Sequence, residues 1–73
     1  MTNKYEGWTR YHIMARDNNW RFIREGMKRS IMTSKDRNEV LKKALYQVSW
    51  KGGLLLIHKR DGSVDFIVDT WIG

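Results

Sequence analysis

The chain has 73 residues with no cysteine and no proline, and its 14 Lys and Arg residues against 8 Asp and Glu residues give a net charge of +6. A single domain of this length, residues 1–73, has little stability to spare for a deep active-site cavity, and without cysteine it forms neither disulfides nor thiolate metal sites. We therefore expect a cytoplasmic protein, and no membrane anchor, because the longest apolar run, Leu54 to Ile57, is far too short to span a bilayer.

Three strands are predicted in the first half of the chain. Residues 1–7 are expected to be a loosely ordered segment. Aromatic and β-branched residues then favour strands over Trp8 to Ala15 and Trp20 to Arg24, and the GluGly pair at 25–26 turns the chain into a third strand around Lys28 to Met32. These strands are expected to form an antiparallel meander.

One helix is predicted after the meander. Asp36 and Glu39 have the spacing of a helix cap and its reciprocal partner. Apolar residues then recur with a period of 3.6, at Val40, Leu41, Ala44, Leu45 and Val48. The GlyGly pair at 52–53 ends the helix, because the last carbonyls need a residue with positive φ, and the next strand begins immediately afterwards.

The last two strands are predicted to form a hairpin around AspGly at 61–62, a favoured central pair for a two-residue turn. The resulting cross-strand pairs are Ile57–Phe66 and Leu55–Val68 on one apolar face, and His58–Asp65 and Leu56–Ile67 on the other. A register shifted by one residue would mix polar and apolar side chains on both faces. The sequence therefore predicts an α+β fold of order β-β-β-α-β-β, with four to five antiparallel strands and one helix packed on one face.

Alternation along the strands divides the predicted sheet into two faces. The helix side is expected to hold Tyr11, Ile13, Ala15, Trp20 and Phe22. The outer face is expected to hold Met14, Arg21, Ile23, Lys28, Leu56, His58 and Ile67. Two interpretations stay open: this face is a contact surface, or Lys and Arg stems shield a small sheet from water.

Basic residues are concentrated in three turn-like strings, at residues 16–19, 24–29 and 59–62. The candidate binding residues are Arg21, Arg24, Lys28, Arg29, Lys59 and Arg60. Such a surface suits an anionic partner, and we expect a small binding module, a regulatory or accessory protein, that contacts an acidic host protein. A DNA- or RNA-binding domain reading through the sheet face is the first alternative, and a homodimer formed through an edge strand or the outer face is the second.

Catalysis and metal binding are not expected. His12 and His58 lack further ligands at a usable spacing, and the serines lack a positioned base. We therefore expect no enzyme activity, no cofactor and no metal. Among the tryptophans, Trp20 is expected in the core and Trp50 and Trp71 at opposite edges of it, which leaves Tyr11 and Trp8 as the candidates for stacking on bases.

Several short motifs, in order and spacing, resemble a known family. They are TyrHisIle (11–13), Trp20, ArgGluGly (24–26), LysArgSer (28–30), the capped helix with Ala44, IleHisLysArgAspGly (57–62), and Thr70 with Trp71. Over about residues 11–71 the chain resembles the small bacterial and phage family of the domain-of-unknown-function series numbered twenty-one eighty-eight. Departures are AspAsnAsn in the first turn, where the family has a glycine, and Val40, where it has a residue such as alanine. The resemblance implies a compact strand, helix and hairpin domain of phage or bacterial origin, and it implies no activity.

The predicted architecture is also similar to the sheet-reading DNA-binding domains of plant transcription factors and to integrase arm-binding domains. In those domains the sheet face enters the major groove. The matching positions here are Arg21, Arg24, Lys28 and Arg29. This similarity is one of fold alone.

Overall fold

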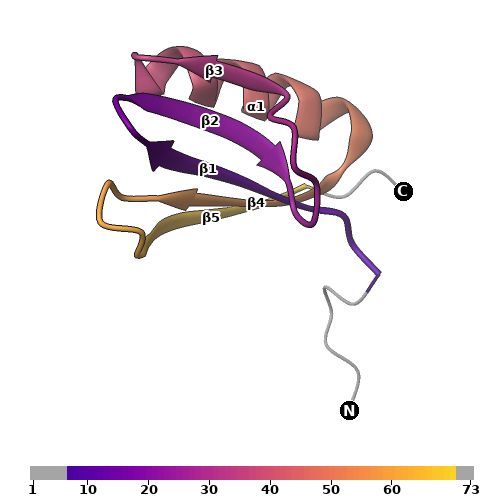
Figure 1. Ribbon diagram of the computed structural model, residues 1–73. Coiled ribbons are helices and arrows are strands. Elements are labelled where there is room, and N and C mark those ends of the chain that lie inside the picture. The colour runs from indigo at the N-terminus through magenta and orange to yellow at the C-terminus, as the bar shows by residue number, and fades with distance from the viewer. Residues whose placement is uncertain (1–6, 71–73) are drawn as a thin grey trace.

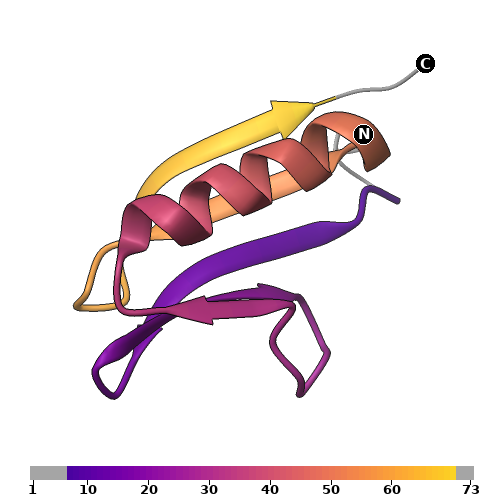
Figure 2. The same cartoon turned by 90° about the horizontal axis from the view of Figure 1, so that it is seen from above.

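The computed structural model describes residues 7–70, which form a five-stranded sheet with one helix packed on one face (Figures 1 and 2). The elements are β1 (Arg10–Arg16), β2 (Asn19–Arg24), β3 (Met32–Ser34), α1 (Arg37–Lys51), β4 (Gly53–His58) and β5 (Val64–Thr70). The predicted α+β class and the order of elements are confirmed. In this range α1 is neither long nor apolar enough to cross a membrane. The expectations for residues 1–6 and for Trp71 lie outside the described residues.

The sheet is mixed, and the prediction of a purely antiparallel sheet is wrong. Its strand order is β3-β2-β1-β4-β5, and β1 pairs with β4 in parallel, from Arg10 opposite Leu54 to Ile13 opposite Ile57. The cause lies in the connections. Because β1 pairs antiparallel with β2, and β2 with β3, β3 runs in the same direction as β1. The helix α1 then returns the chain across the sheet, so β4 also runs in the direction of β1.

The third strand is shorter and later than predicted. Gly26 has a φ of +85° in a turn where the Met27 N–H donates to the Arg24 carbonyl at 3.1 Å. Pairing with β2 resumes only when the Ile31 N–H reaches the Phe22 carbonyl at 2.7 Å. Residues 25–31 therefore form a connection instead of a strand, and β3 starts at Met32. The first strand also starts later than predicted, at Arg10, after a partly buried Trp8.

The predicted caps of α1 are present, with one change in the partners. Asp36 Oδ1 accepts a hydrogen bond from the Asn38 N–H at 2.9 Å. Glu39 acts through Ser34 instead of bonding the cap directly: the Ser34 hydroxyl accepts from the Asp36 N–H at 3.1 Å and donates to Glu39 Oε2 at 2.9 Å. At the other end the N–H of Gly52, whose φ is +76°, donates to the Val48 carbonyl.

The second glycine of the pair has a different role. Gly53 has a φ of +137°, and a Cβ atom there would lie 2.8 Å from the Thr9 carbonyl oxygen and 3.1 Å from the Tyr11 ring. The same carbonyl accepts from the Leu54 N–H at 2.9 Å. Gly53 therefore lets the start of β4 approach the backbone that leads into β1.

The predicted register of the last hairpin is confirmed for three pairs, Leu55–Val68, Leu56–Ile67 and Ile57–Phe66. The predicted pair of His58 with Asp65 is wrong, because His58 lies opposite Val64 and Asp65 is an extra residue in a bulge. The turn is also one residue longer than predicted, since the Lys59 N–H donates to the Ser63 carbonyl at 2.8 Å and encloses Arg60 to Gly62. The longer turn shifts the strand register by one residue and the bulge shifts it back, so the three pairs beyond the bulge match the prediction.

The core lies between α1 and the sheet. Val40, Ala44 and Val48 are buried on the helix, and Leu45 is 39% exposed at the border. The predicted helix-side residues of β1 and β2 pack against them, with Ala15 at the edge. On the outer face, Ile23 and Leu54 are also buried, and Arg21 with them.

Candidate functional site

The six candidate binding residues do not form one basic sheet face. Arg24, Lys28 and Arg29 are exposed near the β2–β3 connection, while Lys59 and Arg60 are exposed in the β4–β5 turn at the opposite end of the sheet (Figure 1). The molecule is 39 Å along its longest axis. Arg21 is only 9% exposed. The structure therefore places three of the six predicted residues at one end of the sheet and two at the other end, and it buries Arg21.

At the β4–β5 end, Arg60 is engaged within the molecule. Its guanidinium lies 5.1 Å from the ring centre of Trp20, which Arg37 also contacts at 5.2 Å. Arg37 Nη2 in addition donates to Asp65 Oδ2 at 3.0 Å, which ties the start of α1 to the bulge in β5. These contacts assign Arg60 a packing role over Trp20 as well as a charge at the surface.

At the other end a hollow of about 460 Å³, here called the basic groove, lies between α1 and the β2–β3 connection. Its cationic residues are Arg24, Arg29 and Lys51. Its other lining residues are Tyr11, Met27, Ser30, Ile31 and Gln47. None of the described residues that line it is acidic. The C-terminus of α1 contributes a partial negative charge of about half a unit, which three full cations outweigh.

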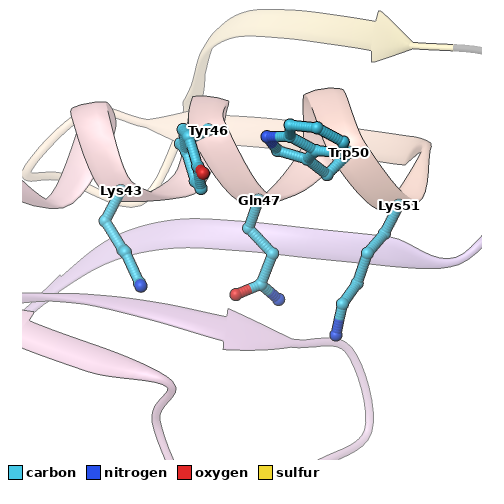
Figure 3. A pocket seen from close by; sticks show the side chains of 5 residues that line it. All are labelled: Lys43, Tyr46, Gln47, Trp50 and Lys51. Carbon is cyan, nitrogen blue, oxygen red and sulfur yellow. The ribbon is translucent and has the colours of Figure 1, made fainter.

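A second hollow lies on the solvent side of α1 and is here called the helix platform. Tyr46 and Trp50 are 64% and 69% exposed, with ring centres 6.3 Å apart. Lys43, Gln47 and Lys51 form a row beside the two rings and point to the side of the helix where β2 and β3 lie (Figure 3). The prediction that Trp50 covers an edge of the core is wrong.

The helix platform could have been found in the sequence. Tyr46 and Trp50 are four residues apart, and Trp50 follows Val48 by two positions, which places it about 200° around the helix from the buried stripe. Lys43, Gln47 and Lys51 repeat the same four-residue spacing. By contrast Tyr11, one of the two predicted stacking candidates, is 6% exposed in the core.

The helix platform and the basic groove are one continuous surface, because Gln47 and Lys51 line both. Along this surface the described lining residues include four cations and no carboxylate. Two of the cations, Arg24 and Arg29, were predicted as binding residues, whereas Lys43 and Lys51 were not. What the arrangement offers is two exposed aromatic faces beside a row of positive charges.

A third and smaller hollow, of about 160 Å³, lies on the sheet face opposite α1 and is here called the Arg21 pocket. It is lined by Arg16, Asp17, Asn19, Arg21, Ser30 and Thr33. Thr33 lies directly opposite Arg21 on β3, and Arg16 opposite Asn19 across the β1–β2 turn. Ser30 also lines the basic groove, so the two hollows meet at the β2–β3 connection.

The two histidines lie side by side on the same outer face. His12 Nδ1 and His58 Nε2 are 2.8 Å apart, His12 Nε2 is 2.9 Å from Glu25 Oε1, and His58 Nδ1 is 3.0 Å from the Gly62 carbonyl oxygen. The two ring planes are inclined to each other by 25°, and the ring centres are 5.1 Å apart. Within residues 7–70 no group of three His, Cys, Asp or Glu side chains is arranged to hold a metal ion.

No family model, no curated protein and no solved structure matches this chain. The resemblance to the domain-of-unknown-function family stays a prediction.

Proposed function

We propose that this protein is a non-enzymatic module that binds single-stranded nucleic acid along the helix platform and the basic groove. The observation that carries the proposal is the exposed pair Tyr46 and Trp50, which lies beside Lys43 and Lys51 and continues into a groove with two arginines. Aromatic faces beside a cationic groove are the combination by which proteins hold nucleic acid strands without reading their sequence.

The aromatic pair supports contact with unpaired bases. Each base that stacks on an aromatic side chain contributes about 1–3 kcal/mol to binding. The rings of Tyr46 and Trp50 lie on the outer surface of α1 (Figure 3). Bases that are paired in a duplex expose only their edges, so their faces cannot stack on these rings. This favours a single strand over a double helix.

The cations support contact with phosphates. Arg24, Arg29 and Lys51 surround one groove, and the acidic side chains that could neutralise them are missing from its described lining. Arginine can donate to a phosphate through two N–H groups at once, and lysine supplies a point charge. A strand whose bases lie on the helix platform would therefore have its backbone in the basic groove.

An acidic protein, the partner expected first from the sequence, is the second candidate. Met27 and Ile31 are 57% and 40% exposed beside the basic groove, and apolar side chains of this kind suit a protein interface. Nucleic acid is favoured because its unpaired bases are flat groups that can stack on the exposed pair Tyr46 and Trp50 while its phosphates meet the neighbouring cations.

The test is fluorescence anisotropy with mixed-sequence single-stranded DNA and RNA over a salt series. We expect log affinity to fall with log salt at a slope of about −0.7 per phosphate contacted, hence about −2 to −3 for three or four contacts. Trp50→Ala and Tyr46→Ala should each weaken binding by about tenfold, the equivalent of 1.4 kcal/mol.

Neighbouring residues supply matched controls. Lys43→Gln should weaken binding, whereas Lys42→Gln, which removes the same charge from an exposed residue outside the platform, should have a smaller effect. Arg29→Gln and Lys28→Gln form the same comparison at the basic groove. If the wild type binds no oligonucleotide in low salt but retains a polyglutamate peptide, and Arg29→Gln abolishes that retention, the acidic-protein candidate is the correct one.

A further inference from the structure

Arg21 is a buried cation that forms no ion pair with any other residue in the range 7–70. Its side chain lies on the sheet face opposite α1, with 9% of the residue exposed. The ion pairs within residues 7–70 join His12 with Glu25 and Arg37 with Asp65, and neither involves Arg21. A charge withdrawn from water is unfavourable unless an opposite charge or a full set of hydrogen bonds replaces the water.

In the described structure Arg21 has one buried N–H without an acceptor. A guanidinium has five N–H donors. In the described structure Nη2 donates to the Lys28 carbonyl at a long 3.3 Å, and the buried Nε has no acceptor. Arg37 provides the contrast, because its Nε is also unpartnered but its Nη2 has both a carboxylate and the His58 carbonyl as acceptors.

The hollow beside Arg21 has the lining that an oxyanion needs. Arg16 adds a second guanidinium, Ser30 and Thr33 add hydroxyl donors, and Asn19 adds an amide. A volume of about 160 Å³ accommodates one phosphate-sized group and not an extended ligand. The Asp17 carboxylate also lines the pocket, and it forms no ion pair with Arg21 in the described structure.

We propose that the Arg21 pocket is a binding site for a single phosphate group, held between Arg21 and Arg16 with hydrogen bonds from the Ser30 and Thr33 hydroxyls. The phosphate supplies the missing counter-charge and acceptors for the unused donors of Arg21. This pocket lies on the other face of the sheet from the helix platform and shares only Ser30 with the basic groove. The proposal rests on Arg21 and its neighbours and not on the proposed nucleic acid binding.

The test is a titration with inorganic phosphate at constant ionic strength, followed by the amide signals of Asn19, Ser30 and Thr33 and by the melting temperature. We expect saturable shifts and a higher melting temperature with phosphate, and neither with chloride. Arg21→Met should weaken phosphate binding at least about tenfold. This variant should remain folded, because an apolar side chain of similar length replaces a buried unpaired charge.

The variant Asp17→Asn gives a second, independent test of anion binding in the Arg21 pocket. Asp17 has a φ of +57°, a conformation that asparagine also adopts, so the backbone should be unchanged. Removing its negative charge should tighten phosphate binding if an anion occupies the pocket. A fall in stability with no gain in affinity would instead mark Asp17 as the counter-ion of Arg21 and overturn the proposal. Lys35→Gln, which removes one positive charge from an exposed residue outside the pocket, is the charge-matched control for Arg21→Met.

A parallel titration with thymidylyl-thymidine, a single phosphodiester, identifies the source of the group. Binding of both probes means that the site holds a nucleic acid backbone, and binding of inorganic phosphate alone means that it holds a free phosphate or a phosphomonoester. Failure of the wild type to bind inorganic phosphate saturably overturns the site, whatever the oligonucleotide experiments at the helix platform give.

Discussion

His12 Nδ1 lies 2.8 Å from His58 Nε2, and the outer nitrogen of each ring meets an acceptor, Glu25 Oε1 or the Gly62 carbonyl oxygen. These three hydrogen bonds require three N–H groups, and two neutral imidazoles have only two. Three N–H groups on the two rings would satisfy all three contacts at once. A further proton would set two N–H groups against each other. The chain of hydrogen bonds thereby links the β2–β3 connection to the β4–β5 turn.

We predict that His58→Asn lowers the free energy of unfolding by about 1–2 kcal/mol, because His12 loses its ring partner while asparagine can still donate to Gly62. Glu25→Gln should have a smaller effect, since Glu25 is 51% exposed. Urea denaturation of both variants and the double variant measures their coupling. Strict additivity would contradict a shared proton, and the ring ¹⁵N shifts of the wild type report directly which nitrogens are protonated.

The cap of α1 gives a second prediction. Asp36→Ala should lower the free energy of unfolding by about 1 kcal/mol, because the Asn38 N–H loses its acceptor. Asp36→Asn retains an oxygen at that position and should lose less. Denaturation midpoints of the two variants decide this, and an Asp36→Ala midpoint equal to that of the wild type would show that the cap does not stabilise the helix.

Two glycines with positive φ should respond differently to alanine. Gly53→Ala should destabilise the protein by about 3 kcal/mol or more, because the added Cβ meets backbone at 2.8 Å as well as an unfavourable φ. Gly62→Ala should lose only about 1 kcal/mol, since its φ of +95° is strained but nothing lies within 4 Å of the added Cβ. Equal losses in thermal unfolding would mean that the approach of β4 to Thr9 can relax.

The β4–β5 turn gives a prediction about pH. Hydrogen bonds from the Ser63 hydroxyl and then from its backbone N–H lower the pKa of Asp61 below its ordinary value of 3.8. The folded state therefore favours the carboxylate, so this contribution to stability is present above about pH 3.8 and is lost as the pH falls through the lowered pKa. Carboxyl NMR titration should show the low pKa, and Ser63→Ala should raise it. A pKa of 3.8 or above in the wild type would contradict the turn geometry.

The last hairpin shows what local sequence can and cannot predict. Alternation of apolar residues was sufficient for the pairing of Ile57 with Phe66, although the structure buries only Ile57 and leaves Phe66 61% exposed. The turn was not predictable, since AspGly fits a two-residue loop and also a longer loop that ends in a left-handed glycine. The bulge at Asp65 coincides with an ion pair to Arg37, a residue from a distant element that no local pattern reveals.

The candidate binding residues divide in a similar way. The clustering of charges predicts the β2–β3 connection and its arginines, whereas the exposure of Trp50 follows from the helical period. The burial of Arg21 could not be read from its neighbours, because alternation assigns it to the outer face without saying which parts of that face are covered. The direction of β4 could have been deduced, since a helix that crosses the sheet after a meander returns the chain parallel to its first strand.

The position of β1 between β2 and β4 has a consequence for the order in which the molecule assembles. The β1–β2–β3 meander can pair as soon as it is synthesised, but β1 keeps one open edge until residues 53–58 arrive. The core between α1 and the sheet is incomplete for the same interval, because Leu55 and Ile57 of β4 belong to it. Closure of so distant a pair is slow compared with hairpin formation. Folding should therefore be a single late event, and a nascent chain that stops before β4 should expose the open edge of β1 that β4 later covers.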